Sequence, residues 1–77
     1  MKLNTVNVIE YFEGTVRQVL SFKDDAFGNT EAEDNFKELV NEHCGIENVS
    51  DAELLDYVAD GVFMDDNGYE LYLVHSD

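Results

Sequence analysis

The stretch DGVFMDDNGYELYLV, residues 60–74, places strand-forming residues on both sides of an Asn67-Gly68 pair. An Asn-Gly pair in this setting is typical of a two-residue β-hairpin turn, because both turn positions need a positive φ that Asn and Gly tolerate. The register of such a hairpin puts Asp65 opposite Glu70. The stretch therefore predicts a C-terminal hairpin with a strongly acidic tip.

Side-chain alternation divides this predicted hairpin into two faces. The more apolar face is the expected core side, and it carries Val62, Met64, Tyr69, Leu71 and Leu73. The second face carries Phe63, Asp65, Glu70, Tyr72 and Val74. Like charges directly opposite each other destabilise a sheet, so the Asp65 and Glu70 pair on the second face invites a functional explanation.

A second hairpin is predicted at the N-terminal end. Residues 5–12 (TVNVIEYF) and 15–22 (TVRQVLSF) are rich in β-branched and aromatic types and are separated only by a Glu-Gly pair. A two-residue turn there puts Glu10 opposite Arg17. The alternative is a short helix over the first segment capped by Asn4, which the valines disfavour. The expected core face of the hairpin consists of Ile9, Tyr11, Val16, Leu20 and Phe22.

Two capping boxes mark helix starts in the middle of the chain. Thr30 with Glu33, and Ser50 with Glu53, each place a hydroxyl cap three residues before a glutamate. Apolar spacing then predicts a first helix over about 31–44 and a shorter second helix, each ending at a glycine. The expected core residues are Phe36, Leu39, Val40 and His43 in the first helix and Ala52, Leu55, Val58 and Ala59 in the second.

These elements predict an α+β fold in the order β-β-α-α-β-β, with both helices packed on one face of an antiparallel sheet made of two hairpins. The 77 residues have room for one core, so residues 1–77 form a single domain. The single cysteine excludes an internal disulfide and suits a cytoplasmic protein. The N-terminal segment lacks a long uncharged apolar run, so we expect neither a signal peptide nor a membrane span.

The sequence does not predict a metal, cofactor or catalytic site. If Gly68 is the sixth residue of an EF-hand loop, the first and twelfth positions are apolar where oxygen ligands are required. His43 and Cys44 are adjacent on a predicted helix and diverge by about 100°, and His75 completes no zinc-binding spacing. A phosphate-binding loop is absent, and no nucleophile is singled out beside either histidine. We therefore expect a non-enzymatic protein.

Charge is the strongest signal in the sequence. Eighteen Asp and Glu residues against four Lys and Arg residues leave a net charge of -14, which excludes direct binding to nucleic acid or anionic lipid. The expected partner is a basic protein. Four acids recur at helical spacing along one side of the first helix: Glu31, Asp34, Glu38 and Glu42. A second group is Asp56, Asp60, Asp65, Asp66 and Glu70, with Phe63 and Tyr72 as aromatic anchors between the charges.

A simpler explanation accounts for part of this pattern. Acids in the first turn of a helix favour the helix dipole, and a solvated helix face is usually polar. The dipole does not account for Glu38, Glu42, Asp56 and Asp60, which lie in middle or last turns where basic residues are preferred. Rows of acids at this pitch are similar to a phosphate backbone, which neutralises basic nucleic-acid-binding proteins.

A small, cysteine-poor and strongly acidic chain that ends in GVFMDDNGYELYLVHSD resembles the inhibitors that phages and other mobile elements encode against host defence. These are anti-CRISPR proteins, anti-restriction proteins and other DNA mimics. The resemblance implies a stoichiometric inhibitor that occupies the nucleic-acid channel of a CRISPR effector or a restriction nuclease, in the cytoplasm of a bacterial host. Because the class has many unrelated folds, no residue roles are carried over.

Other interpretations remain open. The chain is also compatible with a small structural or regulatory subunit that docks through an apolar patch or an open sheet edge. An acidic antitoxin that neutralises a basic toxin has the same surface requirements. A homodimer is compatible with all of these functions. Ionic strength separates the first two, because salt weakens electrostatic mimicry and leaves apolar docking nearly unchanged.

Overall fold

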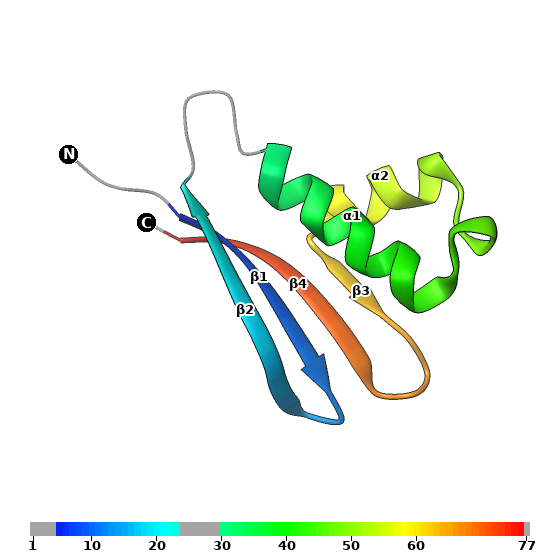
Figure 1. Cartoon of the computed structure of the whole chain (residues 1–77), viewed down its shortest axis with the longest axis horizontal. Coiled ribbons are helices and arrows are strands. Elements are labelled where there is room, and N and C mark those ends of the chain that lie inside the picture. The colour runs from blue at the N-terminus through cyan, green and yellow to red at the C-terminus, as the bar shows by residue number, and fades with distance from the viewer. Residues whose placement is uncertain (1–4, 24–29, 77) are drawn as a thin grey trace.

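A computed structural model describes residues 5–23 and 30–76 of the chain. The elements are β1 (Thr5–Phe12), β2 (Thr15–Lys23), α1 (Thr30–Cys44), the short 3-10 helix η1 (Ile46–Asn48), α2 (Asp51–Asp60), β3 (Val62–Met64) and β4 (Tyr69–Ser76). This order confirms the predicted β-β-α-α-β-β arrangement. The four strands form one antiparallel sheet in the order β2-β1-β4-β3, so the two hairpins join through β1 and β4 (Figure 1).

The helices lie together on one side of the sheet, and the core is the layer between them and the strands (Figure 1). Strand residues alternate between this layer and the opposite face, with Val8 and Leu71 fully buried against the helices. Helix α1 contributes Phe36 and Val40, also fully buried, and α2 contributes Leu54. The helices that the structure describes therefore cover one face of the sheet.

The N-terminal hairpin has the predicted two-residue turn, with Glu13 and Gly14 both at positive φ. Its predicted register is wrong beyond the first two pairs, because a β-bulge follows and Glu10 pairs with Gln18 instead of Arg17. A bulge adds one residue to one strand and exchanges the faces of the residues beyond it. As a result Leu20 and Phe22 do pack on the core, while the predicted core residues Ile9, Tyr11 and Val16 lie on the opposite face.

The C-terminal hairpin also differs from its predicted register by one residue. Asp65, in place of Asp66, pairs with Tyr69: its backbone N–H donates to the Tyr69 carbonyl at 3.1 Å. The Asp65 carboxylate accepts the backbone N–H groups of Asn67 and Tyr69, at 2.9 and 3.0 Å, and this side-chain capture makes the loop three residues long. Among the described residues of this loop, only Gly68 has a positive φ.

The one-residue difference moves every β3 side chain to the other face. Phe63 is buried in the core at 4% exposure, and the predicted core residues Val62 and Met64 face away from the helices. The predictions for Tyr69, Leu71 and Leu73 are confirmed, since all are buried. The two hairpin tips lie side by side, and the Glu13 N–H donates to the Gly68 carbonyl at 2.9 Å.

The helix boundaries agree with the sequence. In α1, Phe36 and Val40 are buried and Leu39 packs against the core as predicted, whereas His43 is exposed. In α2, the predicted buried face is wrong. Ser50 caps α2, accepting the Glu53 N–H at 3.2 Å, and Gly61 ends the helix in the left-handed conformation. The buried residue of α2 is Leu54, with Tyr57 and Val58 beside it, whereas the predicted core residues Ala52, Leu55 and Ala59 are exposed. The predicted cap at Thr30 lies outside the side chains that the structure describes.

Candidate functional site

The four acids predicted to line α1 are all exposed in the structure. Glu31, Asp34, Glu38 and Glu42 lie opposite the buried residues of the same helix, as helical periodicity requires. We call these four residues the α1 acidic row. The α1 segment contains one lysine, Lys37, so the row has little local charge compensation.

Acids of α2 extend the negative surface of the helical layer. Glu53, Asp56 and Asp60 are exposed at intervals of three and four, opposite buried Leu54. The helix contains neither lysine nor arginine. Asp66, at the tip of the β3–β4 loop, is exposed as well. Seven of the acids predicted to contact a partner are therefore accessible on the helices and the hairpin tip: Glu31, Asp34, Glu38, Glu42, Asp56, Asp60 and Asp66.

The other four predicted contact residues are placed differently. Asp65 and Glu70 are half-buried and are not opposite each other, because Glu70 pairs with Met64. The predicted like-charge pair is therefore wrong, and with it the argument that the hairpin tip carries an unexplained cost. Phe63 is buried in the core and is not accessible as an anchor. Tyr72 faces away from the helices, and its hydroxyl donates to the Glu70 carboxylate at 2.5 Å.

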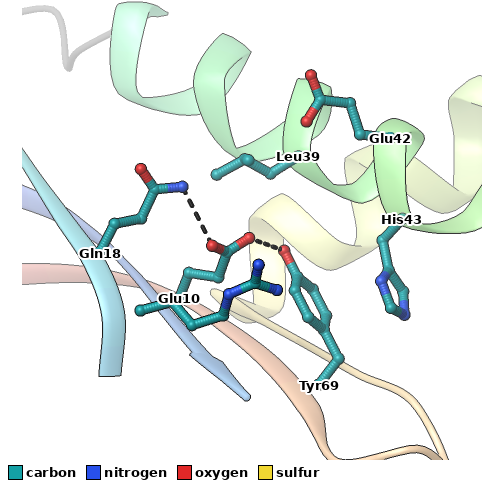
Figure 2. A pocket seen from close by; sticks show the side chains of 7 residues that line it. Glu10, Gln18, Leu39, Glu42, His43 and Tyr69 are labelled. Carbon is teal, nitrogen blue, oxygen red and sulfur yellow. Dashed lines mark hydrogen bonds between the residues drawn. The ribbon is translucent and has the colours of Figure 1, made fainter. Parts of the chain in front are cut away.

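A cavity of about 330 Å³ opens next to the α1 acidic row (Figure 2). Leu39, Glu42 and His43 reach it from α1, and strand residues close it from the other side. The strand residues that line it are Glu10, Arg17, Gln18 and Tyr69. The cavity therefore lies where the N-terminal hairpin and α1 meet.

Glu10 is a buried acid in the wall of this cavity, at 8% exposure. The Gln18 amide donates to one of its carboxylate oxygens at 3.1 Å, and the Tyr69 hydroxyl donates to the other at 2.5 Å (Figure 2). The β-bulge builds this arrangement, because it sets both Arg17 and Gln18 opposite Glu10 and directs them to the cavity. A buried carboxylate requires such partners, since an unpaired charge in the interior is strongly unfavourable.

His43 is held in the cavity wall by contacts with an aromatic and an acidic side chain. Its ring stacks on Tyr69, with ring centroids 3.9 Å apart, and its Nε2 contacts the Asp65 carboxylate. This contact is the main cause that lowers the pKa of Asp65, and the Asn67 and Tyr69 backbone N–H groups add to it. Burial, followed by the hydrogen bond to Glu10, raises the pKa of Tyr69 far above its usual value. Tyr69 therefore stays protonated at neutral pH and acts as a hydrogen-bond donor to Glu10.

The polar groups of the cavity wall are engaged with one another. Both oxygens of Glu10 already accept hydrogen bonds, and His43 is engaged by Asp65. Burial, together with the negative charges of Asp65 and Glu53, raises the pKa of the Cys44 thiol, which keeps it in the unreactive protonated form. Within residues 5–23 and 30–76, no three His, Cys, Asp or Glu side chains are placed to hold a metal ion.

Sequence reasoning missed the cavity because it depends on the bulge. The available signal was the position of Glu10, which follows Val6 and Val8 at intervals of two and so shares their face.

The described helices include none long and apolar enough to cross a membrane. Comparisons with protein-family models, with curated proteins and with solved structures gave no match.

Proposed function

We propose that the chain is a non-enzymatic, stoichiometric inhibitor whose acidic helical surface occupies the basic nucleic-acid groove of a host protein, such as a CRISPR effector or a restriction nuclease. The observation that supports this function is the exposure of the whole α1 acidic row on a rigid element. A helix holds charges at fixed spacing, so the row presents a preformed pattern to a basic groove.

The spacing of the row suits such a groove. From Glu31 to Glu42 the helix rises by about 16 Å, so four charges lie at about one per 5 Å, compared with one phosphate per 3.4 Å of each strand of duplex DNA. The acids of α2 add further charge on the same side of the sheet. Binding would release counterions from the basic partner and would weaken steeply as salt rises.

The test is inhibition of purified nucleases by the intact chain. DNA cleavage by a Cas9-type effector and by restriction nucleases is measured while the chain is titrated in. We expect inhibition of at least one enzyme to saturate at a fixed molar ratio and to be relieved by excess duplex DNA or by higher salt. A chain that inhibits none of these enzymes, or whose inhibition is independent of salt, contradicts the proposal.

Charge-reversed variants make this test specific to the row. Asp34→Lys combined with Glu38→Lys changes the net charge by four units and touches neither the cavity nor the core. The matched control, Glu13→Lys with Glu47→Lys, makes the same change at exposed sites outside the row. We expect the first variant to lose inhibition and the second to keep most of it, whereas equal losses would mean that only the net charge matters.

A second candidate function has its own supporting observation. The sheet face away from the helices is apolar and partly exposed, which suits a small interaction subunit that docks through an apolar surface. Affinity that is unchanged between low and high salt favours this function over electrostatic mimicry.

A further inference from the structure

The sheet face that points away from the helices exposes several large apolar side chains. Val19 and Met64, on the two edge strands, are 52% and 58% exposed, and Val74 on β4 is exposed as well. Tyr11 and Tyr72 meet edge to face between the strands, with ring centroids 5.5 Å apart. We call the following six residues the outer sheet face: Ile9, Tyr11, Val19, Met64, Tyr72 and Val74. Contiguous apolar surface of this kind on a small protein usually marks an interface.

The outer sheet face is also nearly free of the acids that cover the rest of the chain. In the described strands, the register places only Glu70 and Lys23 on this side, so its formal charges cancel. The whole chain, in contrast, carries a net charge of -14. A basic partner would therefore find its electrostatic complement on the helices, and the occupant of the outer sheet face must itself be apolar and neutral.

We propose that this occupant is a second copy of the chain, packed sheet to sheet in a two-fold symmetric dimer. An identical outer sheet face meets both requirements, apolarity and neutrality, and a two-fold contact uses the same patch on both copies. Face-to-face sheets pack about 10 Å apart and bury their alternating side chains, as the two layers of a β-sandwich do. This inference is independent of the inhibitor function proposed above.

Charge repulsion between two copies is weak when they meet through the outer sheet face and strong when they meet through the helices. With about 10 Å for the sheet interface and about 10 Å for each helix layer, the acidic rows of the two copies lie about 30 Å apart. The Debye length at physiological salt is about 8 Å, so repulsion across the dimer is largely screened. Contact through the helices would instead bring the acids of both copies together. The outer sheet face is therefore the side on which two such acidic chains can meet.

The available area indicates a weak dimer. Three strands of about eight residues and one of three cover about 430 Å² of sheet, taking 4.8 Å between strands and 3.3 Å per residue. Counted for both copies, this flat-sheet area reaches about 860 Å², which is below the range of about 1,200–2,000 Å² for stable specific interfaces and within that of weak, transient ones. We expect a dissociation constant in the micromolar range.

Sedimentation equilibrium on the intact chain, from about 5 to about 500 µM, tests the proposal over the range in which such a dimer forms. We expect the wild type to shift from monomer to dimer, and to do so at least as readily when salt is raised from 0.15 to 0.5 M, because salt screens the remaining repulsion. A wild type that stays monomeric at about 500 µM in both salts overturns the proposal and leaves a different apolar partner for this face.

Three substitutions locate the contact. Val19→Glu and Met64→Glu each place a charge on the outer sheet face, on opposite edge strands, and each should weaken association by at least about 100-fold. Leu55→Glu puts the same charge at an equally exposed apolar position on α2, and should leave association unchanged. Circular dichroism melts identify any variant that fails to fold. If one of the two sheet variants does not fold, the association of the other one tests the contact. Loss of the dimer in Leu55→Glu, or its retention in a folded sheet variant, overturns the proposal.

Discussion

Removing the hydroxyl of Tyr69 should destabilise the chain far more than removing that of Tyr72, although both hydroxyls donate to a glutamate at 2.5 Å. Tyr69→Phe keeps the buried ring and its stacking on His43. It leaves one oxygen of the buried Glu10 carboxylate without its donor. Hydrogen bonds to charged groups contribute about 1.5–3 kcal/mol, so we expect a loss of about 2 kcal/mol.

Urea unfolding measures this difference. A domain of this size is expected to have a free energy of unfolding of about 4–12 kcal/mol. With a urea m-value near 1 kcal/mol/M, the loss in Tyr69→Phe appears as a midpoint about 2 M lower. Tyr72→Phe is the matched control, because water can replace the donor to the more accessible Glu70, and its midpoint should hardly change. Equal shifts in the two variants would refute the argument that burial decides the value of the bond.

A double-mutant cycle tests whether Tyr69 acts through Glu10. Glu10→Gln replaces one carboxylate oxygen by an amide donor, which cannot accept a bond from a hydroxyl or amide donor that faces it. We expect Glu10→Gln alone to destabilise the chain, and the double variant with Tyr69→Phe to be at least about 0.5 kcal/mol more stable than the sum of the single losses predicts. Strict additivity would mean that the two side chains do not depend on each other.

Three further predictions concern the fold. Leu54→Ala should cost about 2–4 kcal/mol of unfolding free energy and Leu55→Ala under about 1, because only Leu54 is buried; equal costs in urea unfolding would contradict the observed face of α2. Glu13→Asn should stabilise the chain by about 0.5–1 kcal/mol, because Glu13 sits at φ 52, where Asn is better tolerated; a lower melting temperature would contradict this. Folding lowers the pKa of Asp65. The ionised Asp65 side chain therefore stabilises the fold at pH values above its unfolded-state pKa of about 3.8, and this stabilisation is lost as the pH falls through its folded-state pKa. Asp65→Asn should therefore flatten the fall in urea midpoint between about pH 5 and about pH 2, and an unchanged fall would exclude that role.

The sequence predicted the element types and their order because those depend on local signals. Capping boxes, terminal glycines and β-branched segments act over a few residues and indicated both helices and both hairpins. The faces of the strands were predicted less well. In β1, apolar residues such as Val8 and Ile9 occupy both faces, so the hydrophobic pattern does not select one register.

Two single-residue features decided the faces. Capture of the Tyr69 N–H by Asp65 lengthened one loop, and the bulge at Arg17 lengthened one strand. Because strand side chains alternate with period two, each feature exchanged the faces of a whole segment. The acidic surface of the helices was predicted correctly as exposed, since it depends only on the helical repeat. The cavity around Glu10 was not predicted, because it requires the bulge and contacts between distant elements.

The bulge at Arg17 gives β2 one residue more than the strand it pairs with. Deleting Arg17 would remove the bulge and leave the pairing beyond it unchanged, so that Gln18 would still lie opposite Glu10 and Leu20 opposite Val8. The cavity wall would lose one side chain, and the buried face of β2 would be kept. A deletion of one codon here would therefore be far less damaging to folding than a deletion within β4, which pairs without a bulge and in which all residues beyond the deletion would exchange faces.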